Sequence, residues 1–400
     1  MFVAKSPFER LRERLHGVPP GAAPIDLTVG SPKHAPPRFI ADVIAEHAAS
    51  FRDYPPIAGT PTLRAAITDY LARRYHVGDL LAEHGDILPL NGSREGLFLA
   101  AVSARDLLQK PDPTVLFANP FYQVYPGSAQ AIGARPVPVS ASGSVVPDFA
   151  AVDEADLRSA IAFYVAAPSN PAGLCASTAD WHALFDVAEH HNFFIFADEC
   201  YAEIYREASG PPVGALEAAK ERPDALKRLV VFHSLSKRSN LAGLRAGFAA
   251  GGREAMNAMR DFRNQVGPQV PTPLQEAAAV VYGDDAHVAE NRRLYDEKYA
   301  IADKILGPQF GKVSTPAGFF LWLPVAGDDV EATVDLWQRV GVRGVPGSYL
   351  ALTPTGQQNP GRGFVRLALV ADASATREAL TRIVGAGALE PCRERVALGS

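Results

Sequence analysis

Lys237 directly follows Ser236, with Ser234 two positions before that serine, in the segment from Phe232 to Gly247, and Arg245 follows in the same segment. A lysine that binds an aldehyde as a Schiff base needs a fixed amine. A phosphate attached to that aldehyde needs hydroxyls and a guanidinium nearby. This segment supplies both sets of groups, which favours a catalytic, cofactor-binding lysine over the alternative of a basic surface turn.

Two upstream segments carry groups that suit a phosphorylated ring. Gly92 and Ser93, followed by Arg94, are expected at the start of a helix, where free N–H groups and the helix dipole attract a phosphate. Tyr122 follows the apolar run 115–118 and is able to stack on a planar ring. Taken alone, the first segment is more often an ordinary helix N-cap, and the second more often packs a loop.

Two polar residues suit the other edges of such a ring. Asn170 lies in the turn-forming segment 168–173, where its amide is able to donate to a ring oxygen. Asp198 ends the very apolar run 193–197. A carboxylate against a pyridinium nitrogen keeps the ring protonated and electron-withdrawing. The alternative for Asp198 is a capping residue for the segment that follows.

The runs that position these residues alternate with helical periodicity. Four apolar runs end in polar residues, glycine or proline, as buried parallel strands do: 115–118, 161–166, 193–197 and 229–232. Residues 178–189 predict a capped helix between two of them. This alternation predicts an α/β fold with its ligands at the carboxyl ends of the strands.

The pattern changes near residue 285. Residues 287–306 predict a long charged amphipathic helix, and short strands are expected at 319–323 and 363–369. We therefore predict a large domain over residues 45–285, with a mostly parallel sheet sandwiched by helices. Residues 1–44 and 286–400 are expected to form a smaller α+β domain.

Composition and charge exclude several classes of protein. Among the 400 residues, 47% are apolar and 21% charged, as in folded enzymes. A net charge of −5 without basic blocks argues against nucleic acid, and no apolar run is long enough to cross a membrane. The three cysteines lack disulfide or metal-site spacing, so we expect a cytoplasmic protein with no metal. No GxGxxG segment is present, which argues against a nucleotide-binding dehydrogenase.

Together these segments resemble the fold-type I pyridoxal-phosphate enzymes of the class I/II aminotransferase family over nearly the whole chain. The resemblance implies that Lys237 carries the cofactor and that Asp198 faces its ring nitrogen. It implies that Tyr122 lies over the ring and that Asn170 and Tyr201 contact its hydroxyl. The full set of implied cofactor residues is Tyr54, Gly92, Ser93, Arg94, Tyr122, Asn170, Asp198, Tyr201, Ser234, Ser236, Lys237 and Arg245.

The resemblance also implies a substrate site and a homodimer. Arg366, inside the apolar run 363–369, matches the arginine that binds the substrate α-carboxylate, with Gly30 and Asn170 beside it. A planar guanidinium suits that role because it binds a carboxylate through two parallel hydrogen bonds. The alternative is a surface arginine on a strand. Tyr54 matches a tyrosine that reaches the phosphate in the partner subunit.

Finer features resemble one subgroup, the succinyldiaminopimelate transaminases of lysine biosynthesis. The matching segments are 32–34, 91–95, 119–123, 198–205, 234–240, 347–350 and 359–363. This resemblance implies a ping-pong exchange between glutamate/2-oxoglutarate and N-succinyl-2-amino-6-oxopimelate. Ser31 and segment 267–273 depart from the subgroup, which leaves the substrate specificity open.

Several alternatives share the same residues. An aspartate-type aminotransferase, a β-lyase and a decarboxylase all begin with the same carbanion chemistry on this cofactor. A regulator with a cofactor-binding domain is a non-enzymatic alternative, although little chain precedes Gly30 to form a DNA-binding domain. Candidates for binding a distal carboxylate are Lys33, Arg38, Arg94 and Arg263, each of which is otherwise a solvated charge.

Overall fold

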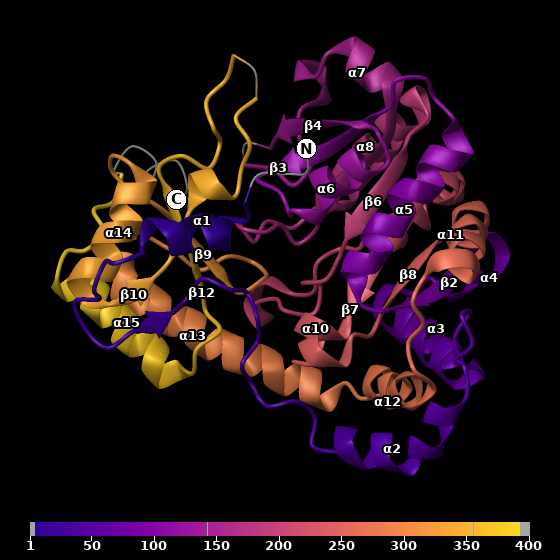
Figure 1. The fold of residues 1–400 in the computed structure, drawn as a ribbon, viewed down its shortest axis with the longest axis horizontal. Helices are drawn as coiled ribbons and strands as arrows, with labels where there is room; N and C mark the ends of the chain where they lie inside the picture. The colour runs from indigo at the N-terminus through magenta and orange to yellow at the C-terminus, as the bar shows by residue number, and fades with distance from the viewer. Residues whose placement is uncertain (1–4, 142, 355, 393–400) are drawn as a thin grey trace.

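The computed structural model describes residues 5–141, 143–354 and 356–392 (Figure 1). Its largest sheet has seven strands in the order β2-β8-β7-β6-β5-β3-β4. These are β2 (Gly85–Leu90), β3 (Thr114–Asn119), β4 (Arg135–Ser140), β5 (Ala160–Ala166), β6 (Phe194–Asp198), β7 (Leu229–Ser234) and β8 (Gly247–Gly252). The pairs from β7 to β4 are parallel, while β8 is antiparallel to both neighbours. The predicted mostly parallel sheet is confirmed.

Helices cover both faces of this sheet. One face packs on α5 (Ser93–Leu108), α6 (Val124–Ala131) and α11 (Arg253–Val266). The other packs on α3 (Pro61–Tyr75), α4 (Gly78–His84), α8 (Thr178–His191), α9 (Ala215–Ala219) and α12 (Thr272–Gly283). Fully buried side chains such as Trp181 and Phe163 fill these layers. Each large apolar side chain buried this way contributes about 1.5–3 kcal/mol to stability, which fixes the strand ends in place.

The C-terminal part builds a second, smaller core. A three-stranded antiparallel sheet has the order β11 (Val345–Pro346), β12 (Phe364–Ala368) and β9 (Phe320–Pro324). It packs on α13 (Ala286–Phe310), α14 (Asp329–Val340) and α15 (Ala373–Gly385). These elements are the short strands and helices that the sequence predicts after residue 285.

The N-terminal segment joins this smaller core. Strand β1 (Ile25–Asp26) pairs in parallel with β10 (Val342–Arg343). Helix α1 (Pro7–Arg14) is capped by the Ser6 side chain, and Leu11 packs with Trp337 in a small buried cluster. Helix α2 (Ile40–Glu46) instead packs beside α12. The domain boundaries at 44/45 and 285/286 stay predictions.

Helix α13 connects the two parts of the molecule (Figure 1). Near its start, the Asn291 side chain donates to the Lys237 carbonyl at 3.4 Å and to the Arg238 carbonyl at 3.3 Å. Two turns later, buried Lys298 donates to the carbonyl of Leu369, just after β12, at 2.9 Å. One helix therefore contacts both the segment around Lys237 and the small sheet.

The remaining helices are short. Helix α7 (Glu154–Ser159) precedes β5, and α10 (Leu235–Arg238) follows β7 and contains Lys237. Within the described residues, no helix has the length and apolarity needed to cross a membrane.

Candidate active site

A pocket of about 500 Å³ lies where the carboxyl ends of β3, β5, β6 and β7 face the small sheet and α1. The predicted residues therefore meet at the carboxyl ends of the parallel strands, where ligands bind in this type of sheet. The predicted residues that line the pocket are Gly30, Ser93, Arg94, Tyr122, Asn170, Asp198, Tyr201, Ser234, Ser236, Lys237, Arg245 and Arg366.

One end of the pocket forms a cup suited to a phosphate. Gly92 has a φ of +83° and precedes α5, which starts without a side-chain cap, so its first N–H groups face the cup. This positive φ favours glycine, and the Arg245 guanidinium occupies the space that a Cβ at Gly92 would take. Arg245 is held by the carbonyls of Asn91 (3.0 Å) and Ala242 (2.9 Å). A helix start, a guanidinium and the Ser234–Ser236 hydroxyls thus surround one space.

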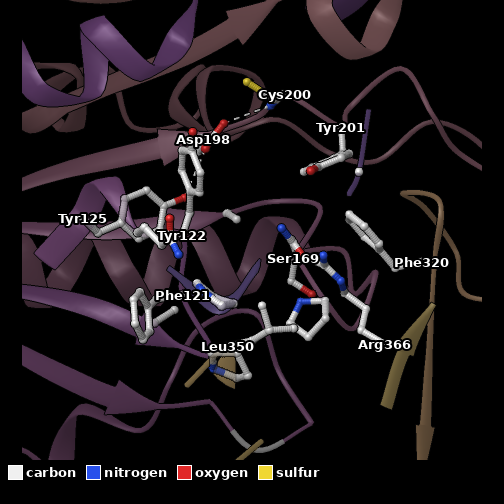
Figure 2. A pocket seen from close by; sticks show the side chains of 18 of the residues that line it. Phe121, Tyr122, Tyr125, Ser169, Asp198, Cys200, Tyr201, Phe320, Leu350 and Arg366 are labelled. Carbon is white, nitrogen blue, oxygen red and sulfur yellow. Dashed lines mark hydrogen bonds between the residues drawn. The ribbon is translucent and has the colours of Figure 1, made fainter. Parts of the chain in front are cut away.

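Asp198 lies deep in the pocket at the end of β6 and is 7% exposed (Figure 2). The Tyr125 hydroxyl donates to one carboxylate oxygen at 3.1 Å, and the backbone N–H of Cys200 donates to the other at 3.3 Å. Burial raises the pKa of Asp198, and these two donors partly oppose that rise. A cationic ring nitrogen beside the carboxylate would offset the burial cost, so the site fits a pyridinium.

Tyr125 is a contact that the sequence did not reveal. Its ring is fully buried and stacks on Tyr164, with ring centroids 4.8 Å apart and an interplanar angle of 13°. The hydroxyl of Tyr164 donates instead to the Leu97 carbonyl at 2.6 Å. Tyr125 follows Tyr122 by less than one helical turn in the same segment, and no motif marks it as a partner of Asp198.

Lys237 extends from α10 into the pocket, where its Nζ donates to the Gly30 carbonyl. Burial is the main cause that lowers its pKa to about 8. A substantial fraction of the amine is therefore neutral near physiological pH, and only the neutral amine is a nucleophile or a base.

Arg366 lies on β12, across the pocket from Asp198 (Figure 2), and is 3% exposed. It donates to the Asn170 side-chain oxygen at 3.0 Å and to the Thr28 carbonyl at 2.7 Å. Its guanidinium also lies 4.5 Å from the Phe320 ring centre. Within the described residues, no group accepts from its Nε. Burial lowers the Arg366 pKa to about 10, and a buried guanidinium without a carboxylate partner fits an incoming carboxylate.

Two predicted tyrosines also line the pocket. The Tyr122 hydroxyl accepts a hydrogen bond from Arg94 Nε at 2.6 Å. The Tyr201 ring packs edge-on against Phe319 and Phe320, and burial raises the pKa of its hydroxyl. Tyr201 thus stays a neutral donor, as contact with a ring oxygen would require.

Some predicted residues lie elsewhere. Tyr54 is 98% exposed and does not line the pocket, so its predicted contact with a partner subunit stays a prediction. Lys33 and Arg38 also lie outside the pocket wall. Arg263 is 1% exposed and pairs with Glu95 at 3.0 Å, so it is unable to reach a substrate in this pocket.

The outer wall contains two cations that sequence reasoning missed. Lys5 and Arg10, on or next to α1, line the pocket together with Phe8. They are remote in sequence from the other pocket residues, and the helix carries no motif. Only the packing of α1 on the small sheet brings them to the site.

Comparisons with known proteins agree with this geometry. A family model described as aminotransferase class I and II matches residues 22–383. An LL-diaminopimelate aminotransferase from Desulforudis audaxviator is 30% identical, covering 91% of each chain. An aminotransferase structure from Neisseria meningitidis has a TM-score of 0.90 at 35% identity, covering 96% of this chain and 98% of that one.

A further solved structure carries a more specific name. A probable N-succinyldiaminopimelate aminotransferase from Thermus thermophilus has a TM-score of 0.81 at 27% identity, covering 95% of this chain and all (100%) of that one. The matches span nearly the full length of both partners, and the pocket fits pyridoxal 5′-phosphate at its phosphate cup and at Asp198. The chain belongs to the class I and II aminotransferase family, whose members use pyridoxal 5′-phosphate.

Proposed function

We propose that the protein transfers an amino group between glutamate/2-oxoglutarate and N-succinyl-2-amino-6-oxopimelate. The observation that carries this proposal is the charge of the pocket wall. Lys5, Arg10, Arg94 and Arg366 line it, and within the described residues Asp198 is its sole carboxylate. A succinylated substrate presents carboxylates to these cations, whereas a free distal amine would meet like charge.

We assign the cofactor's place to the groups already described. The cup at Gly92, Ser93 and Arg245 would hold the phosphate, with Ser234 and Ser236 beside it. Asp198 would contact the ring nitrogen, Tyr122 the ring face, and Asn170 and Tyr201 the ring hydroxyl. When bound, pyridoxal 5′-phosphate supplies an electron sink for the carbanion that forms at the substrate α-carbon.

Lys237 would move the proton in this reaction. Lys237 lines the pocket, and its pKa of about 8 leaves neutral amine available to accept the α-proton. The same nitrogen, once protonated, would deliver the proton to the cofactor side within the same half-reaction, and the second half of the cycle would run this transfer in reverse. The nearby Gly30 carbonyl accepts from Nζ and so restricts where the amine lies.

Arg366 would orient the substrate. Its Nη atoms are fixed by Asn170 and Thr28, and this leaves Nε without an acceptor within the described residues. A carboxylate bound there would pair with the buried guanidinium and so offset the cost of burying its charge. Such binding would hold the α-carbon in one position relative to Lys237. The proton transfer would then occur between two groups that are already held in place in one complex.

We also propose a homodimer. Tyr54 and Phe51 are 98% and 55% exposed, so this segment presents two aromatic side chains that a partner subunit would cover. In the proposed dimer Tyr54 would reach the partner's phosphate cup. Chains carrying Tyr54→Ala and chains carrying Lys237→Ala would each be nearly inactive, but remixing them after mild dissociation would restore part of the activity. No recovery on remixing, with mass measurement showing mixed dimers, would refute the shared site.

Transamination of free LL-diaminopimelate is a second candidate, favoured by the name of the Desulforudis audaxviator relative. The two candidates differ in the distal nitrogen, which is a neutral amide in one substrate and a cation in the other. The cationic pocket wall favours the amide. An aspartate-type activity is a third candidate, which the panel below also tests.

A half-reaction panel separates these candidates. The purified holoenzyme would be mixed in turn with N-succinyl-LL-diaminopimelate, LL-diaminopimelate, glutamate and aspartate, and loss of the cofactor absorbance followed. We expect fast conversion by the first and third compounds and slow conversion by the others. Faster conversion by free LL-diaminopimelate than by its succinyl derivative would overturn the proposed specificity.

A further inference from the structure

Helix α1 forms the outer wall of the pocket and is firmly held there. Ser6 caps its first turn at 3.1 Å, and Leu11 and Leu15 are 4% and 8% exposed in a cluster with Trp337. Phe8 lies 6.0 Å from the Arg366 guanidinium, measured to the ring centre. The helix therefore presents its pocket-lining side chains from a fixed position opposite the cofactor end of the site.

Arg10 is held over an aromatic ring. Its guanidinium carbon lies 3.7 Å from the centre of the Tyr349 ring, and both residues line the pocket. A guanidinium stacked on a ring keeps its N–H donors free at its edge, where a carboxylate is able to bind through two hydrogen bonds. The stack restricts the side chain, so less conformational entropy is lost when a ligand binds.

The other pocket cations already have hydrogen-bond partners. Lys5 pairs with Glu13 at 2.6 Å, and Arg94 donates to the Tyr122 hydroxyl. Arg245 and Arg366 each donate to two oxygen atoms of the chain. Within the described residues, no carboxylate, carbonyl or hydroxyl accepts from the Arg10 side chain.

We infer that Arg10, supported by Tyr349, is the binding site for the distal carboxylate of the substrate. For the proposed substrate this is the succinyl carboxylate, so that assignment rests on the proposed function. The subsite itself rests on the stacked, unpaired guanidinium and takes an anionic group carried at the far end of a long amino acid. Glutamate, which lacks a group at that distance from its α-carbon, should bind without it.

Binding of two unreactive probes tests the subsite without relying on turnover. Both are 6-aminohexanoate derivatives, one succinylated and one butanoylated on nitrogen, so that only the first has a distal carboxylate. Holoenzyme of the wild type is expected to bind the succinyl probe about tenfold more tightly, as one charge-assisted hydrogen-bonded pair provides. Arg10→Gln should bind both probes with equal dissociation constants, measured by calorimetry.

Matched variants control this test. Arg12→Gln removes an exposed arginine from the same helix that does not line the pocket, so it should retain the tenfold preference. Tyr349→Phe keeps the ring under Arg10 and should also keep the tenfold preference, whereas Tyr349→Ala should weaken that preference. The circular dichroism spectrum and the absorbance of the bound cofactor show whether each variant is folded and carries the cofactor.

The outcomes distinguish the subsite from the proposed function. An Arg10→Gln variant that still prefers the succinyl probe, or a wild type without preference, would overturn the subsite. If the wild type prefers that probe through Arg10 yet fails to convert N-succinyl-LL-diaminopimelate, the subsite stands and the proposed substrate falls. If conversion is fast and its KM is unchanged in Arg10→Gln, the substrate stands and the subsite falls.

Discussion

The inner and outer halves of the pocket are built by different means. In the inner half, Asp198 and Arg366 are 7% and 3% exposed, and each is held by one backbone group and one side chain. In the outer half, Arg10 and Arg94 are held by single contacts to tyrosine side chains. The difference separates two tasks, since the shared carbanion chemistry needs fixed groups, whereas recognition of the substrate's far end depends on a few replaceable side chains.

The inner half has a cost in stability that the outer half avoids. Lys237, Asp198 and Arg366 all have pKa values shifted toward their neutral forms, with burial the largest cause. The outer cations Arg10 and Arg94 are exposed, so they escape this burial cost. The comparison yields four predictions, in order of expected size.

The largest effect is expected from Lys237→Ala, which removes the proposed base. The glutamate half-reaction should slow by roughly 10³-fold or more, since a positioned base contributes about 10²–10⁴-fold and the amine also anchors the cofactor. Stopped-flow absorbance measures the rate. Lys227→Ala, an exposed lysine in an ion pair with Asp224, is the control and should match the wild type. If Lys237→Ala keeps even a tenth of the wild-type rate, Lys237 is not the base of the reaction.

The second prediction concerns folding of the cofactor-free protein. The pKa of Lys237 falls from 10.5 to about 8 on folding, so the folded state is penalised below pH 8 by about 3 kcal/mol. The penalty fades as the pH rises from about 8 to 10.5, because the folded amine then loses its proton while the unfolded amine keeps it. Lys237→Met should therefore raise the urea midpoint at pH 7, and by less at pH 10. An equal gain at both pH values would contradict this origin.

The third prediction compares the two carboxylate sites directly. Arg366→Gln should lower kcat/KM by roughly 10²-fold for glutamate and for N-succinyl-LL-diaminopimelate alike, because both present an α-carboxylate. Arg10→Gln should affect only the longer substrate. Steady-state kinetics with both amino donors measures the pattern. A loss at Arg366 confined to one donor would mean that this arginine selects substrates rather than orienting them all.

The smallest effect is expected from Tyr125→Phe, which removes one donor to Asp198. Loss of a hydrogen bond to the charged form should raise the Asp198 pKa further, and move the acidic limb of the kcat/KM profile to higher pH. We expect about a tenfold loss of rate at pH 7, with the absorbance of the bound cofactor shifting with pH. Tyr164→Phe is the control, because Tyr164 stacks on Tyr125 but donates to a backbone carbonyl. Identical pH profiles for both variants would exclude a role for the Tyr125 hydroxyl.

The sequence predicted the inner half better than the outer half for a physical reason. Asp198 and Ser234 end apolar runs, and parallel strands bring such ends together whatever the loops do. Strand β8 was missed because its segment, Gly247–Gly252, is rich in glycine and alanine. In the structure, a Cβ at Gly251 would overlap the backbone of β7, so small residues are required there.

Tyr125 and Arg10 were missed because their importance depends on packing between distant elements. Tyr125 reaches Asp198 only once α6 lies against the sheet, and Arg10 reaches Tyr349 only once α1 lies against the small core. Neither segment has a pattern of its own. The domain boundaries and the contact of Tyr54 with a partner subunit stay predictions.

Helix α13 fixes the distance between two segments of the site. Asn291 and Lys298 lie seven positions apart on one rigid helix, a separation of about 10 Å along its axis. Asn291 holds the backbone that carries Lys237, and Lys298 holds the backbone that continues from Arg366. The distance between Lys237, which would move the proton, and Arg366, which would bind the α-carboxylate, is thereby set by a rigid helix. Substrates of different length must then place their α-carbon at the same position, and only the part beyond it, toward α1, differs in its contacts.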